Sequence, residues 1–127
     1  MYIDHTTIRT DEIELTKNFF MKVFDMQLGK RPELIERSIM GYWLCFNNKP
    51  LIHIIKNQYN NRESKSISAE AIDHTAFCLT GYESFKQKLI DLKIPFSIMD
   101  LEDIGERRIF FRTPTNILLE AVFREKT

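Results

Sequence analysis

The chain has 127 residues, of which 18 are basic and 18 acidic, so its formal net charge is zero. This balance argues against non-specific nucleic-acid binding, which needs a basic surface to displace counterions. A hydrophobic content of 43% with ten Phe residues is enough for one domain with a packed core. No apolar run approaches the roughly 20 residues of a membrane-spanning helix.

The N-terminal residues and the two cysteines indicate where the protein is expected to reside. The first four residues, 1–4, do not resemble a signal peptide. Cys45 and Cys78 fall among apolar neighbours in predicted strands. We therefore expect two buried free thiols and a cytoplasmic protein rather than a disulfide framework.

The first half of the chain predicts a strand, a helix and three further strands. Residues 2–9 alternate in polarity and contain many β-branched side chains, which favours a strand. Residues 12–24 place apolar side chains on one broad face, as in a core-facing helix. The three strands are expected at 27–31, 40–46 and 51–56. Asn47 and Asn48 predict a hairpin turn between the last two.

The second half repeats this order after a polar linker at residues 57–70. A strand is predicted at 72–79 and a helix at 82–92. Three more strands are expected at 96–99, 107–112 and 117–123. We therefore predict an α+β fold in a single domain built from two β-α-β-β-β modules, at about 1–56 and 71–127.

A repeated tetrapeptide marks a candidate metal site. The sequence Ile-Asp-His-Thr occurs at residues 3–6 and again at 72–75. His53 follows His5 by 48 residues, and Glu120 follows His74 by 46. Each half therefore carries one candidate ligand near its start and a second near its end.

The residue types at these four positions suit a divalent metal ion. All four are predicted within strands, where a buried carboxylate such as Glu120 must be paired or bound to a cation. Imidazole and carboxylate groups are ligands for Zn²⁺, Ni²⁺, Fe²⁺, Co²⁺ or Mn²⁺. A single strand histidine is more often structural. The symmetric placement of all three histidines with Glu120 nevertheless favours a metal site, with His53 as a ligand or a substrate contact.

The chain resembles the vicinal oxygen chelate superfamily, also called the glyoxalase/bleomycin-resistance/dioxygenase fold. The resemblance covers essentially the whole chain and rests on residues 5–9, 19–26, 50–53, 73–77 and 110–120. It implies that two β-α-β-β-β modules pair into a cup-shaped mixed sheet around a divalent metal, with the helices outside. It also implies that His5, His74 and Glu120 are the commonest ligand triad. His53 matches a fourth position, which holds a glutamate in glyoxalase I.

Two features depart from the family pattern. The final hairpin reads Thr-Pro-Thr-Asn at residues 113–116 in place of Asp-Pro-Asp-Gly, although Asn tolerates the left-handed conformation that Gly would supply. With His53 in place of glutamate, Glu120 would have to serve as both ligand and base.

The resemblance implies a glyoxalase-like lyase or isomerase that acts on a small substrate with two neighbouring oxygens. The metal would stabilise a developing enediolate, and Glu120 would move the proton. Arg9 matches a glutathione-contacting arginine of glyoxalase I and would bind a substrate carboxylate. A solvated charge at a strand end is an equally good interpretation of Arg9.

Three other interpretations remain open. An extradiol-type Fe(II) dioxygenase would use the same triad, with His53 as its acid/base. A thiol transferase of the fosfomycin-resistance type would use Thr7 to contact a phosphonate, although Thr7 is also a good strand former. A non-catalytic drug-binding relative would lack the metal. Family members often form homodimers, so we also expect a homodimer.

Overall fold

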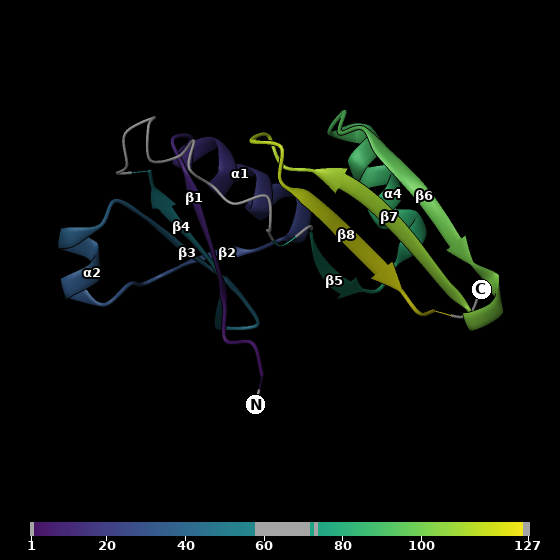
Figure 1. Ribbon diagram of the computed structural model, residues 1–127, viewed down its shortest axis with the longest axis horizontal. Helices are drawn as coiled ribbons and strands as arrows, with labels where there is room; N and C mark the ends of the chain where they lie inside the picture. The colour runs from purple at the N-terminus through teal and green to yellow at the C-terminus, as the bar shows by residue number, and fades with distance from the viewer. Residues whose placement is uncertain (1, 58–71, 73, 126–127) are drawn as a thin grey trace. The chain divides into compact units, whose positions relative to one another are not determined.

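The structure is a computed structural model that describes residues 2–57, 72 and 74–125 (Figure 1). Two compact units divide the chain, Met1–Ala69 and Glu70–Thr127. Each unit holds one four-stranded mixed sheet with helical segments, so the predicted α+β fold class is confirmed. Most of the predicted linker, residues 58–70, lies outside the described residues.

The first unit forms a sheet in the order β1-β4-β3-β2. Its elements are β1 (Thr6–Thr10), α1 (Ile13–Phe24), β2 (Gln27–Gly29), α2 (Glu33–Ser38), β3 (Gly41–Phe46) and β4 (Lys49–Lys56). β1 and β4 are parallel, and the other pairs are antiparallel. The sequence did not predict α2, because this six-residue helix buries no side chain and so has no apolar periodicity.

Helix α1 packs against β3 and β4. It buries one face, formed by Ile13, Thr16, Phe19, Phe20, Val23 and Phe24. It ends where Asp25 adopts a left-handed conformation, with φ of 55°. The sheet residues Ile8, Leu44 and Ile54 are buried, whereas their neighbours in sequence point to the opposite face.

The hairpin between β3 and β4 forms as predicted. Asn47 and Asn48 both have positive φ, at 50° and 63°. Two such residues give the turn whose twist matches that of the flanking strands.

The second unit repeats the topology, with strand order β5-β8-β7-β6. Its elements are β5 (Thr75–Leu79), α4 (Tyr82–Asp91), β6 (Phe96–Leu101), a 3-10 turn η1 (Glu102–Ile104), β7 (Glu106–Arg112) and β8 (Leu118–Phe123). Phe85 of α4 lies 5.7 Å, between ring centroids, from both Phe111 and Phe123. Asn116 has φ of 73° in the last turn, so this residue does replace the family's glycine there.

The first strand of each unit is shorter than predicted. β1 begins at Thr6 and β5 at Thr75, so His5 and His74 precede their strands instead of lying within them. Tyr2, Ile3 and Ile72 are 85%, 86% and 88% exposed. No packing therefore draws these segments into the sheets.

The prediction of two buried thiols was wrong. Both cysteines are free, but Cys78 is exposed and Cys45 is half-buried, because each lies on the sheet face that the helix does not cover. Within the described residues, no helix has both the length and the apolar character to cross a membrane.

Candidate functional site

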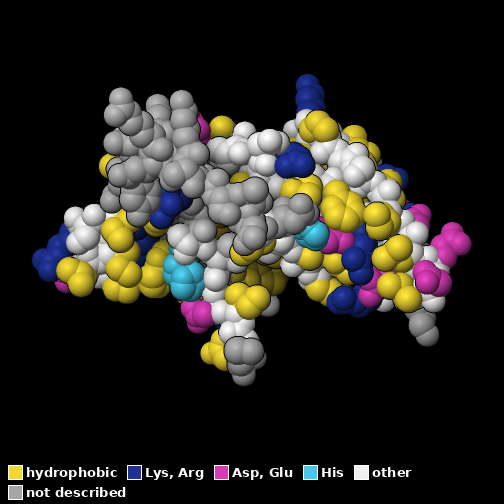
Figure 2. Space-filling model, viewed as in Figure 1, with side chains coloured by type: hydrophobic (Ala, Val, Ile, Leu, Met, Phe, Trp, Pro, Cys, Tyr) yellow, Lys and Arg dark blue, Asp and Glu magenta, His cyan; other side chains and the backbone are white. Residues whose placement is uncertain are grey.

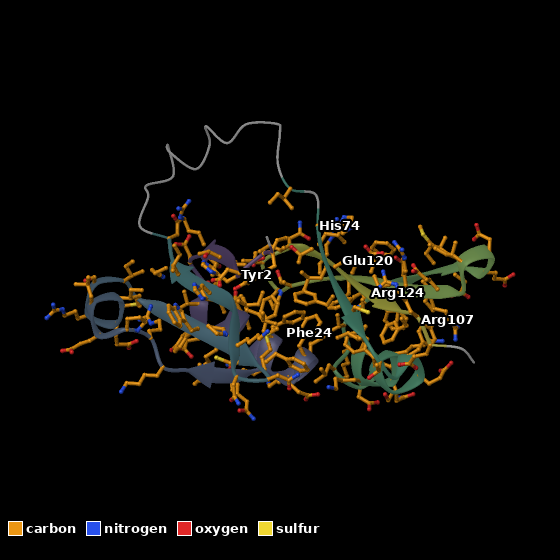
Figure 3. The ribbon with its side chains drawn as sticks, turned by 90° about the horizontal axis from the view of Figure 1, so that it is seen from below. Tyr2, Phe24, His74, Arg107, Glu120 and Arg124 are labelled. Atoms are coloured by element: carbon orange, nitrogen blue, oxygen red, sulfur yellow. The ribbon has the colours of Figure 1, made fainter. Side chains whose placement is uncertain are left out.

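The second unit brings two of the predicted ligands together. Glu120, in β8, is only 3% exposed, and its Oε2 lies 3.0 Å from His74 Nε2 (Figure 3). Its other oxygen, Oε1, accepts a hydrogen bond of 3.1 Å from Arg108 Nη1. Each oxygen of this buried carboxylate therefore has a cationic or hydrogen-bonding partner.

Arg108 connects Glu120 to a row of charged side chains on the face away from α4. Its Nη2 lies 2.5 Å from Glu106, whose other oxygen lies 2.8 Å from Arg124 Nε. Hydrogen bonds from Arg108 and Arg124 lower the pKa of Glu106. The hydrogen bond to Glu106 in turn raises the pKa of Arg108. Because Arg108 already supplies a cation, the burial of Glu120 does not by itself require a metal.

The first unit brings the other two predicted ligands together. The rings of His5 and His53 stack with centroids 3.8 Å apart and planes at 15°. Trp43 stacks against the His53 ring at 4.4 Å and 8°. His5 Nδ1 lies 2.7 Å from Asp4 Oδ2. His53 is thus held by aromatic contacts, while His5 is oriented by a carboxylate.

His53 has the chemistry of a metal ligand. Its Nε2 is buried and has no hydrogen-bond partner among the described residues. Burial lowers the pKa of His53, and the neighbouring His5 lowers it further, which favours the neutral ring. The ring also forms a backbone hydrogen bond with Pro50. Since proline has no amide hydrogen, we assign Nδ1 as the donor, which leaves the Nε2 lone pair available.

Both pairs occupy the same place in their units. In the parallel ladders, Thr7 pairs with His53 and Ala76 pairs with Glu120. Thr7 follows His5 by two residues, just as Ala76 follows His74. Position for position, His5 therefore corresponds to His74, and His53 corresponds to Glu120.

The geometry of the second pair suits ligation of one ion. Two ligands about 2.1 Å from a metal and 90° apart lie roughly 3.0 Å from each other, which is the separation of His74 Nε2 and Glu120 Oε2. The nitrogen lone pairs lie in the ring planes, and the planes of His5 and His53 are nearly parallel at 15°, so one ring must turn before both nitrogens reach one ion. The His5 side chain is 36% exposed and has room to turn. Across residues 2–57, 72 and 74–125, no group of three or more His, Cys, Asp or Glu is arranged to hold a metal.

Comparison with known proteins establishes the family. The sequence profile of the Glyoxalase/Bleomycin resistance protein/Dioxygenase superfamily matches residues 2–121. The chain belongs to this superfamily. No curated protein matches the sequence of this superfamily member.

Solved structures of low sequence identity share the fold. A protein from Bacillus anthracis, provisionally assigned to the glyoxalase family, is 24% identical, with a TM-score of 0.75 over 98% of this chain and 96% of that one. The fosfomycin resistance protein FosX from Listeria monocytogenes is 16% identical, with a TM-score of 0.71 over 97% and 93%. A glyoxalase family protein from Enterococcus faecalis is 22% identical, with a TM-score of 0.67 over 95% and 96%.

The two predicted substrate contacts of this superfamily member lie on β1, on the same face as His53. Thr7 is directly opposite His53 in the ladder, and Arg9 is opposite Ile55. Thr7 and Arg9 are both exposed. Their roles in binding substrate stay predictions.

Sequence reasoning missed the residues that surround the ligands. Trp43 is opposite His53 in the β3–β4 ladder. Phe110 is opposite Glu120 in the β7–β8 ladder, and Arg108 shares the face of Phe110 because it lies two residues away. Strand alternation shows that Arg108 and Phe110 share a face, but placing Arg108 beside Glu120 also requires the register between β7 and β8.

Histidine side chains reach the molecular surface on the face shown in Figure 2.

Proposed function

We propose that this superfamily member is a metal-dependent, glyoxalase-like lyase or isomerase that acts on a small substrate with two neighbouring oxygens. The proposed ligands are His5, His53, His74 and Glu120, and the ion is divalent: zinc, nickel, iron, manganese or cobalt. The observation that carries the proposal is the equivalent register of the two pairs in the repeated units. The buried, unpartnered Nε2 of His53 supports it.

A bound divalent ion would supply Lewis-acid stabilisation of negative charge developing on a substrate oxygen. Glu120 is the proposed proton acceptor, because it is the carboxylate of the ligand set. Arg108 holds one oxygen of Glu120 at 3.1 Å and so acts as a positioning residue for the other. Trp43 fixes the plane of the His53 ring by stacking.

Thr7 favours a second candidate function, that of a fosfomycin-resistance thiol transferase. Thr7 lies directly opposite His53, so its hydroxyl is close to one of the proposed ligands. The Listeria protein with a TM-score of 0.71 is a fosfomycin resistance protein, which makes fosfomycin a natural substrate to assay.

Metal titration of the full chain tests the proposal. We expect one Zn²⁺ or Ni²⁺ per chain, with affinity at least about 100-fold weaker in His53→Ala, His74→Ala and Glu120→Gln. Glu102→Gln removes an exposed carboxylate from the second unit and should bind as the unaltered protein does. Equal affinity in all the variants would contradict the proposed site.

Activity assays of the metal-loaded protein separate the candidate functions. Conversion of a thiohemiacetal would support the lyase or isomerase, and addition of a thiol to fosfomycin would support the transferase. Oxygen uptake by the iron form with a catechol would support a dioxygenase. A metal-loaded protein that is inactive in every assay would contradict the enzymatic proposal.

We also propose that the protein forms a homodimer, as the sequence resemblance implied. Light scattering on the purified chain should give about twice the 15.1 kDa chain mass. A monomer mass at micromolar concentration would contradict this.

A further inference from the structure

The first unit contains a pocket on the sheet face opposite His53. Its volume is about 540 Å³, and its lining includes residues from α1, α2, β3 and the end of β4, a size typical of small-molecule sites. Tyr42 lines the pocket and pairs with Ile54, which is completely buried. His53 is adjacent to Ile54 in β4, so its side chain points to the other face.

A buried arginine in this pocket has an unsatisfied donor. Arg31 lines the pocket, and its side chain is only 3% exposed. Its Nε lies 2.8 Å from Glu36 Oε2, but its Nη1 is buried without a hydrogen-bond partner among the described residues. A buried cationic donor without an acceptor is costly. An anion in the pocket would supply that acceptor.

Two further cations line the same pocket. Lys56 donates from Nζ to the carbonyl of Asp11 at 2.8 Å, and its ammonium group carries three donors in all. Arg37 lies on α2. Against Arg31, Lys56 and Arg37 stands one lining carboxylate, that of Glu36. The pocket is therefore locally cationic in a chain whose formal net charge is zero.

An acidic side chain that contacts this lining, Glu14, is already paired. Glu14 accepts a hydrogen bond from the Tyr42 hydroxyl and lies 2.8 Å from Lys17 Nζ. Apolar side chains complete the lining, namely Ile13, Ile39 and Met40. The pocket thus combines donors for an anionic group with an apolar wall.

We propose that this pocket binds a small organic anion, with a carboxylate or phosphate head and an apolar body. Arg31 Nη1 and Lys56 Nζ bind the head, because charge-assisted hydrogen bonds are the strongest available to it. Arg37 adds positive charge, and the isoleucine and methionine side chains contact the body. This site is separate from the proposed metal ligands, which lie on the opposite face or in the other unit.

NMR titration of the full chain tests the proposal, with inorganic phosphate, hexanoate and neutral hexanamide as probes. We expect saturable shifts at the amides of residues 31–41 and 56 with hexanoate or phosphate, and none with hexanamide. Comparison of the two anions identifies whether the head is a carboxylate or a phosphate. Lys56→Gln and Arg37→Gln should each weaken binding about tenfold, as should Arg31→Gln if this buried variant folds.

Lys49→Gln is the matched control, because it removes the same charge from the opposite, exposed end of β4. It should leave the affinity unchanged. Absence of saturable shifts with both anions, or equal affinity in Lys49→Gln and Lys56→Gln, would overturn the proposal. His74→Ala and added Zn²⁺ should not alter hexanoate binding, so the result is independent of the proposed metal site.

Discussion

The two units share one topology but stabilise their polar pairs differently. In the first unit, His53 is held between aromatic rings and retains a buried nitrogen without a partner among the described residues. In the second, Glu120 is satisfied by His74 and Arg108. The same register position therefore holds a neutral imidazole, that of His53, in the first unit and a charge-compensated carboxylate, that of Glu120, in the second. A repeated scaffold fixes where the side chains lie, and their neighbours determine what each can do.

Core substitutions should have the largest effect and would show whether the two units are equally dependent on their cores. Phe20 and Phe123 are 0% and 1% exposed. Replacement of either by Ala should lower the free energy of unfolding by about 3–5 kcal/mol. Chemical denaturation measures the loss. A much smaller loss for one variant would mean that its unit packs less tightly than the structure shows.

Arg108→Met tests the charge compensation that distinguishes the second unit. It leaves the buried carboxylate of Glu120 without its arginine, so we expect a clear loss of stability, although smaller than for a fully buried pair. Added Zn²⁺ should restore much of this stability, because the ion replaces the missing cation. Arg112→Met, on the same strand and exposed, should cost at most about 0.5 kcal/mol. Equal losses in the two variants would contradict the compensating role of Arg108.

The pH dependence of stability should show the effect of the lowered pKa of His53 in the first unit. Because burial lowers its pKa in the folded state, the unfolded chain binds a proton more readily. Stability should therefore fall as the pH drops below about 6.5, the ordinary pKa of histidine. His53→Gln should remove this part of the decline when unfolding is measured between pH 5 and 8. The lowered pKa of Glu106 affects stability at lower pH. The stabilisation that ionised Glu106 contributes is lost as the pH falls below about 4.5. An unchanged profile in His53→Gln would contradict the assignment.

Turn substitutions should have the smallest effects and should be alike in both units. Asn48 and Asn116 have φ of 63° and 73°. Replacement by Gly should stabilise by about 0.5 kcal/mol, while replacement by Ala should cost about 1 kcal/mol, because a Cβ disfavours this conformation. Thermal unfolding of the four variants gives the comparison. A loss of stability in both Gly variants would mean that the Asn side chains make contacts that the backbone argument omits.

Periodicity and the repeated tetrapeptide were enough to predict the α+β fold, both long helices and which ligand candidates belong to each module. Helix α2 was missed because it buries nothing, and the starts of β1 and β5 were misplaced because alternation continues into exposed residues. The row of charged side chains formed by Glu106, Arg108 and Glu120 could not be predicted, because it depends on the register between β7 and β8. The pocket beside Arg31 depends likewise on α2.

The X-ray absorption spectrum of the zinc-loaded protein tests the central claim most directly. If the proposed ligands bind one ion, the spectrum should show several imidazole nitrogens and a carboxylate oxygen at about 2.0–2.2 Å. The imidazole contribution should fall in both His53→Ala and His74→Ala. A sulfur ligand at about 2.3 Å, or a single imidazole that only one of these variants removes, would contradict the account.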